Sequence, residues 1–150
     1  MNPAERAEKA AAYFKEGYNC AQSVAMAFAD EAGTDEKTLA KLASSFGGGM
    51  GRLREVCGAV SGMFLIYGMV CGYDSPEDAE GKKEQYRQIQ AMAEEFEKRR
   101  GSIVCREILK KPAGRDHYVP AERTKAYYDF RPCESCVMDA AEILEIFLRK

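Results

Sequence analysis

Apolar residues recur at intervals of three and four along most of the chain, which is the spacing of amphipathic helices. No segment alternates apolar and polar residues for long enough to predict a strand. Residues typical of helix starts and stops separate the periodic segments, and no repeat or low-complexity tract divides the chain. We therefore expect an all-α fold, a single-domain bundle of about six to seven helices over residues 1–150.

Helix starts can be placed at several polar residues. Asn2 precedes a proline, and Asn19 stands three residues before Gln22, as in a capping box. We also expect Thr34 to cap a short helix and Ser75 to start a long one. The expected helices run over residues 3–17, 19–33, a short stretch after 34, 54–70, about 75–100, 103–109 and from 132 onward.

One of these segments, residues 54–70, is apolar almost all round, which is typical of a helix at the centre of a fold. Gly58 and Gly62 lie one turn apart in it, so another backbone or a ligand can approach closely there. A glycine-rich turn, residues 47–51, precedes it. The predicted long helix after residue 75 has Ala79, Tyr86 and Phe96 among its inward-facing residues.

Composition narrows the chemistry. The formal net charge of −2 argues against a broad nucleic-acid surface. No stretch resembles a signal peptide or a membrane span, so we expect a cytoplasmic protein, either a monomer or a homodimer. Thiols are mostly reduced in the cytosol, and the six cysteines therefore point to metal binding or redox chemistry before structural disulfides.

Four cysteines fall in predicted first helical turns, where free N–H groups and the helix dipole stabilise a thiolate. They are Cys20, Cys57, Cys105 and Cys133. We expect them to converge on one interior site, either as metal ligands for zinc, iron or an iron–sulfur cluster, or as redox thiols. The alternative is that they are small buried hydrophobic residues.

The other two cysteines differ in what they predict. Cys133 and Cys136 form a CxxC at a helix start, where Cys136 is either a resolving partner of Cys133 or part of a buried stripe. Cys71, near a helix end, is expected to fill space.

Residues near Cys57 complete the candidate site. We expect Gly49 and Gly58 to let backbone come close to a ligand, and Arg52 to lower a thiol pKa or meet an anion. Arg54 is interpreted as a surface arginine, and His117, the only histidine, as a solvated loop residue. The glycine turn lacks the order of a phosphate-binding P-loop.

Two segments together resemble the C_GCAxxG_C_C family, which is described as redox-active. They are Gly47-Gly48-Gly49-Met50-Gly51-Arg52 and Glu55-Val56-Cys57-Gly58-Ala59-Val60-Ser61-Gly62. By this resemblance Cys20, Cys57, Cys105 and Cys133 correspond to the four cysteines of the family pattern. The resemblance implies thiol or metal-linked redox chemistry. We expect Cys57 to be the central thiolate.

The sequence thus predicts a cytoplasmic redox protein. Its electron partner is either another protein or a small carrier, and neither nucleic acid nor membrane is expected to bind. The competing hypothesis is a helical binding module whose cysteines only fill the core.

Overall fold

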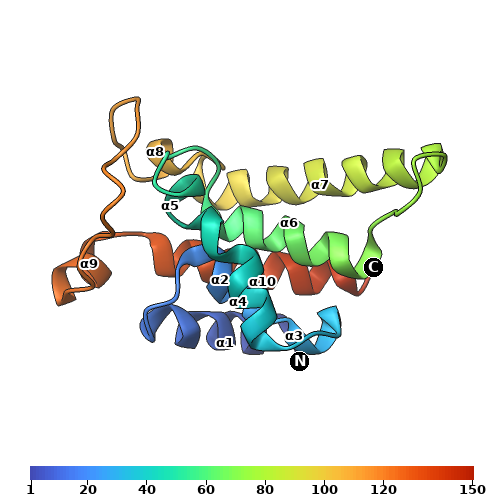
Figure 1. Cartoon of the computed structure of the whole chain (residues 1–150), viewed down its shortest axis with the longest axis horizontal. Helices are drawn as coiled ribbons and strands as arrows, with labels where there is room; N and C mark the ends of the chain where they lie inside the picture. The colour runs from blue at the N-terminus through green and yellow to red at the C-terminus, as the bar shows by residue number, and fades with distance from the viewer.

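The computed structural model describes residues 1–150 and is mostly helical, with no β-strand (Figure 1). The all-α prediction is therefore confirmed. A single antiparallel bridge joins Val56 to Val104. The elements are α1 (Pro3–Lys15), α2 (Cys20–Met26), α3 (Ala29–Ala32), α4 (Glu36–Ala43), the 3₁₀ turn η1 (Ser44–Phe46), α5 (Gly47–Met50), α6 (Gly58–Cys71), α7 (Ala79–Arg100), α8 (Cys105–Ile108), α9 (Lys125–Phe130) and α10 (Cys133–Leu148).

Polar caps fix several helix starts where the sequence predicts them. The Asn2 side chain accepts a hydrogen bond from the Glu5 backbone N–H. Asn19 and Gln22 form both halves of a capping box at the start of α2. The last helix follows Pro132, as expected.

Other boundaries were predicted wrongly, and the chain has more and shorter helices than expected. The predicted helix 19–33 breaks into α2 and α3. Asp35, rather than Thr34, caps α4 by accepting from Thr38 N–H. Asp78 caps α7, which begins at Ala79 instead of Ser75. A carboxylate is a strong N-cap acceptor. Both helices therefore begin after the aspartate that follows the predicted cap.

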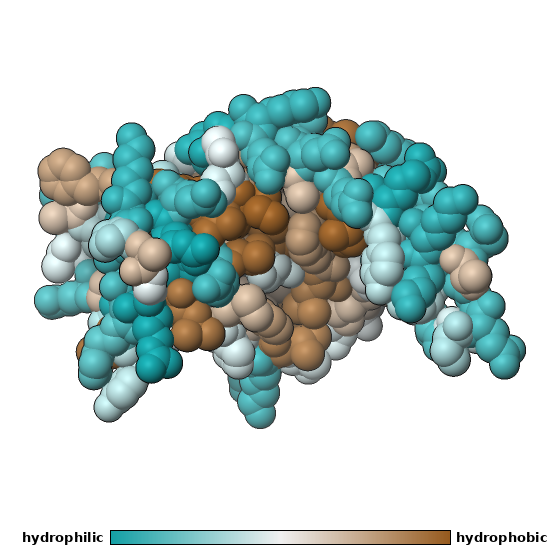
Figure 2. Space-filling view, turned by 90° about the horizontal axis from the view of Figure 1, so that it is seen from above, coloured by the Kyte–Doolittle hydropathy of each residue, from teal (hydrophilic) through white to brown (hydrophobic).

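The core lies where α1, α2, α6 and α10 pack against one another, with α7 lying along α6 and α10 (Figure 1). Its inward side on α7 is formed by Met92 and Phe96, whereas Tyr86, which was predicted to face inward, is 54% exposed. The prediction failed because only the second half of α7 packs into the core: both of its buried residues lie there, and hydrophilic side chains cover the end of the molecule where α7 begins, at the right of Figure 2. No helix is both long and apolar enough to span a bilayer.

Helices α2 and α6 approach closely because α6 has glycine at the contact. A Cβ atom on Gly62 would lie 2.6 Å from the Ala21 carbonyl oxygen, and one on Gly58 would lie 2.9 Å from the Phe46 carbonyl oxygen. Both distances are shorter than any normal contact between a carbon and an oxygen atom. Neither position therefore accepts a larger side chain unless the backbone moves. The close approach predicted at these two glycines is confirmed, and its partner is backbone.

We expect Gly62→Ala to destabilise the fold by about 1–3 kcal/mol, because the added methyl group overpacks a rigid contact. Gly68→Ala, in the same helix, is the matched control, since its Cβ would lie 3.8 Å from Gln85 Nε2. That substitution should be neutral or stabilise by up to about 1 kcal/mol, because alanine favours helix. Urea unfolding of both variants measures the difference, and equal stabilities would contradict the tight contact.

Candidate functional site

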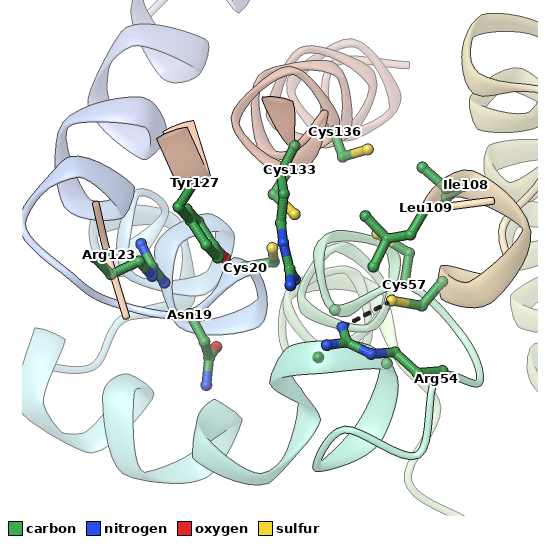
Figure 3. Close-up of a pocket in the computed structure, with 15 residues that line it drawn as sticks. Asn19, Cys20, Arg54, Cys57, Ile108, Leu109, Arg123, Tyr127, Cys133 and Cys136 are labelled. Carbon is green, nitrogen blue, oxygen red and sulfur yellow. Dashed lines mark hydrogen bonds between the residues drawn. The ribbon is translucent and has the colours of Figure 1, made fainter. Parts of the chain in front are cut away.

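Five of the six cysteines line one cavity of about 60 Å³. It lies at the end of the molecule where α2, α6, α8 and α10 begin (Figures 1 and 3). Its walls also contain three arginines and no aspartate or glutamate. The lining residues are Asn19, Cys20, Gly48, Gly49, Arg54, Cys57, Gly58, Cys105, Ile108, Leu109, Arg123, Tyr127, Arg131, Cys133 and Cys136.

The helix starts carry the cysteines to this cavity. Cys20, Cys105 and Cys133 are the first residues of α2, α8 and α10, and Cys57 is the residue that precedes α6. The sequence predicts that Cys57 lies inside a helix beginning at Arg54, but residues 54–57 are not helical: Arg54 has a φ of +61° and Val56 forms the bridge to Val104. Each thiol therefore meets the N-terminal end of a helix, where unpaired N–H groups stabilise negative charge.

A short antiparallel contact explains why residues 54–57 are not helical. Cys57 N–H donates to Ile103 O at 2.7 Å, and Cys105 N–H donates to Glu55 O at 2.6 Å. These bonds hold the chain before α6 beside the start of α8. Gly49 closes the other side, since a Cβ there would lie 2.6 Å from Cys105 Cβ. Its φ of +68° is also one that glycine adopts readily.

Cys133 and Cys20 form the first sulfur pair, and Figure 3 shows their side chains directed toward each other. The Cys20 thiol donates a hydrogen bond to the Cys133 thiolate, and this bond lowers the pKa of Cys133 to about 6 against the opposing effect of burial. Arg131 and a hydrogen bond from Tyr127 act in the same direction. The same hydrogen bond, together with burial, raises the pKa of Cys20. Cys133 is half-buried, so a thiolate there is accessible from outside.

Cys57 and Cys136 form the second pair, and both are buried. The Cys136 thiol donates to the Cys57 thiolate, which lowers the pKa of Cys57 and raises that of Cys136. Backbone N–H groups of Ala59 and Val60, at the start of α6, add to the stabilisation of Cys57. The two cysteines of the CxxC thus have different hydrogen-bond partners, although the sequence had suggested Cys136 as a partner for Cys133.

Cys105 interacts with an arginine instead of a cysteine. Arg54 Nη1 donates to Cys105 Sγ at 3.5 Å, the contact dashed in Figure 3. Burial raises the pKa of Cys105, and Arg54 opposes that rise. Arg54 is only 3% exposed, so its interpretation as a surface arginine was wrong. The reason is Asp116, which accepts from Arg54 Nε at 2.7 Å and compensates the buried charge.

Asp116 comes from the long loop that follows α8 and binds several cations there. Lys111 and Arg54 together lower the pKa of its carboxyl group to about 2. Arg52 also lies within reach of Asp116, at 3.9 Å, and its Nε donates to the His117 carbonyl oxygen. The loop is thereby fastened over the glycine turn. Arg52, one of the predicted ligand-binding residues, lies outside the cavity wall, whereas Gly49 and Gly58 are part of it.

The remaining predicted residues lie away from the cavity. His117 is exposed, as expected for a loop histidine. Cys71 is exposed at the end of α6 and therefore fills no core space, contrary to expectation. No three cysteine, histidine, aspartate or glutamate side chains are grouped in a way that would hold a metal ion.

Three cavity residues were missed by the sequence analysis. They are Arg123, Tyr127 and Arg131, none of which is a candidate site residue in the sequence analysis. Both guanidinium groups lie 4.8 Å from the Tyr127 ring centroid. Burial raises the pKa of Tyr127 to about 12, and the nearby Cys133 adds to the rise. Figure 3 shows the hydroxyl end of Tyr127 directed toward the Cys20–Cys133 pair. Only Arg131, two residues before Cys133, gave a local signal in the sequence.

We expect Cys20→Ser to raise the pKa of Cys133, because a serine hydroxyl at this position reaches less far than a thiol. A return toward the ordinary thiol value would lower the thiolate fraction at pH 7 from roughly nine-tenths to a few per cent. The rate of iodoacetamide labelling of Cys133, followed by mass spectrometry from pH 4 to 10, measures this pKa. Cys71→Ser is the matched control and should leave the midpoint unchanged, while an unchanged midpoint in Cys20→Ser would remove Cys20 as the donor.

One of three comparisons with known proteins finds a match. The family model described as "Putative redox-active protein (C_GCAxxG_C_C)" matches residues 18–147, which include all the cysteines of the cavity. No curated protein and no solved structure matches the chain. Since the match spans most of the sequence, the chain belongs to the C_GCAxxG_C_C family.

Proposed function

We propose that the protein is a thiol–disulfide oxidoreductase in which Cys133 is the attacking thiolate and Cys20 the resolving thiol. The observation that carries this proposal is that Cys20 and Cys133, the first residues of α2 and α10, line one cavity with their side chains directed toward each other (Figure 3), and their opposite pKa shifts agree with it. Cys133 is shifted downward, to about 6, and Cys20 upward. When the surroundings of two thiols give them different pKa values, the two can take different roles. The thiol with the lower pKa is the nucleophile, because it is already a thiolate, and the other reacts later.

The reaction takes place in two exchange steps with a disulfide of a partner molecule. The Cys133 thiolate attacks one sulfur of that disulfide, a mixed disulfide forms, and the other sulfur leaves as a thiolate that takes up a proton. Cys20, deprotonated as it attacks, then displaces the remaining partner sulfur from Cys133. A Cys20–Cys133 disulfide results, two electrons pass to the partner, and both of its sulfurs end as thiols. The reverse sequence oxidises a dithiol partner.

Accessibility and charge support Cys133 as the entry point. It is half-buried, while Cys57, Cys105 and Cys136 are buried. Arg131 and Tyr127 both stabilise its thiolate, and neither is bonded to a carboxylate. In this proposal the Cys57–Cys136 pair is a second two-electron couple, deeper in the protein, that forms its own disulfide.

The sequence adds an expected domain organisation and location to this proposal. It takes the chain as a single helical domain arranged around α6, acting in the cytoplasm with a protein or small-molecule redox partner. Metal binding through Cys20, Cys57, Cys105 and Cys133 is the competing function. The pairwise arrangement of the sulfurs favours exchange chemistry over such a four-cysteine centre, because Cys105 is bonded to Arg54 instead of grouped with the other thiols.

Cys20→Ser should arrest the reaction at the mixed disulfide. After incubation with oxidised glutathione, intact-mass and peptide analysis should find glutathione attached to Cys133 in the variant. The wild type should instead accumulate the internal disulfide, because Cys20 displaces the glutathione. Cys136→Ser is the matched control and should still form the Cys20–Cys133 bond.

Three results would contradict the proposal. A Cys133–Cys136 disulfide in the Cys20→Ser variant would assign resolution to the CxxC. Unreactive cysteines throughout would favour the binding-module hypothesis. Stoichiometric zinc or iron in anaerobically purified wild type, found by elemental analysis, would favour the metal centre.

A further inference from the structure

The charges around the cysteine cavity are unbalanced when the thiols carry no charge. Arg54, Arg123 and Arg131 line the cavity, and no carboxylate does. Asp116 compensates part of this charge from behind Arg54, but Lys111 shares the same oxygen. The protein therefore keeps an excess of cationic groups around a small, partly open cavity, and such an arrangement attracts anions.

Arg54 has a donor left over. Its Nε binds Asp116 and its Nη1 binds Cys105, yet Nη2 is buried and has no hydrogen-bond partner in the protein. A buried guanidinium N–H without an acceptor is costly, by more than a lost neutral hydrogen bond. Figure 3 shows the end of this side chain directed into the cavity, so an acceptor held there would satisfy Nη2.

Unlike Arg54, the other two arginines have no acidic partner. Arg123 donates to the carbonyl oxygens of Phe14 and Tyr18 and lies over the Phe14 ring at 4.3 Å. Arg131 lies over Tyr127, and its guanidinium makes no ion pair. Their positive charges therefore remain available to a ligand in the cavity.

We propose that this cavity is a binding site for a small inorganic oxyanion, held by Arg54 with the charges of Arg123 and Arg131. Guanidinium groups bind oxyanions through paired N–H donors, and three of them around one cavity fit a compact, multiply charged ligand. The volume of about 60 Å³ exceeds what one water needs and is far below the roughly 300 Å³ of pockets for drug-sized ligands. This volume suits a small oxyanion better than a nucleotide or a peptide.

The same arginines face the reactive thiols, which links the anion to the redox state. In the reduced protein, the thiolates at Cys133 and Cys57 provide negative charge beside the arginines. Formation of the Cys20–Cys133 and Cys57–Cys136 disulfides removes this negative charge, because disulfide sulfurs are neutral. The bound anion then supplies the negative charge beside the arginines. Oxidised protein should therefore bind the anion more tightly than reduced protein, and by linkage the anion should favour the disulfide form. This redox dependence rests on the proposed exchange function, whereas the anion site itself does not.

Titration calorimetry with sodium sulfate at constant ionic strength tests the site, since thiols do not reduce sulfate. Oxidised wild type should bind one sulfate per chain, and Arg131→Gln should weaken that binding about tenfold or more. Arg131 is the better position for substitution because it has no hydrogen bond or ion pair to lose, whereas Arg54→Gln could also unfold the protein. Arg87→Gln, on the exposed face of α7, is the matched control and should bind as the wild type does.

A Cys20→Ser/Cys133→Ser variant separates this proposal from the exchange function, because it cannot carry thiolate at the first pair and needs no oxidation. It should bind sulfate more tightly than reduced wild type at pH 8. Equal, weak binding by wild type, Arg131→Gln and the serine variant would overturn the anion site. Sulfate binding that depends on Arg131 but is the same in oxidised and reduced wild type would retain the site and overturn its link to the thiols.

Discussion

The geometry of the site depends on the backbone contact between α2 and α6. At Gly58 and Gly62 no side chain separates α6 from α2, so the two helices start close together. Cys20 and Cys57, at these two starts, are thereby brought to one end of the molecule. Helix α10 packs against both α2 and α6 and adds Cys133 and Cys136. A larger residue at either glycine would therefore push α6 away from α2 and increase the distance between Cys20 and Cys57, although neither cysteine is itself altered.

Two opposing effects then decide the chemistry of the thiols. Burial disfavours a thiolate, while helix N-termini and arginines favour it. Within each sulfur pair one cysteine accepts the hydrogen bond and the other donates it. The pKa of the acceptor is therefore lowered, and that of the donor is raised. The Cys20 thiol, Arg131 and Tyr127 all lower the pKa of Cys133. Cys105 receives only Arg54 and remains on the protonated side.

Local signals in the sequence predicted part of this arrangement. Asn19 with Gln22 and Pro132 marked helix starts next to cysteines, and the spacing of Gly58 and Gly62 marked a close contact. The role of Arg54 was not predictable from its neighbours, because its burial depends on Asp116, which lies 62 residues away in an irregular loop. The pairing of Cys133 with Cys20 was missed for the same reason, since it is set by how α2 and α10 pack. The break of the predicted helix at residues 54–57 follows from hydrogen bonds to residues 103–106, which are also distant in sequence.

The most direct test of the account is a disulfide map of the wild-type protein. The reduced protein would be oxidised with excess oxidised glutathione, blocked with iodoacetamide in denaturant, digested without reductant and analysed by mass spectrometry. The account predicts Cys20–Cys133 and Cys57–Cys136 bonds, with Cys71 and Cys105 alkylated. A Cys133–Cys136 bond as the main product, or six alkylated cysteines, would contradict it.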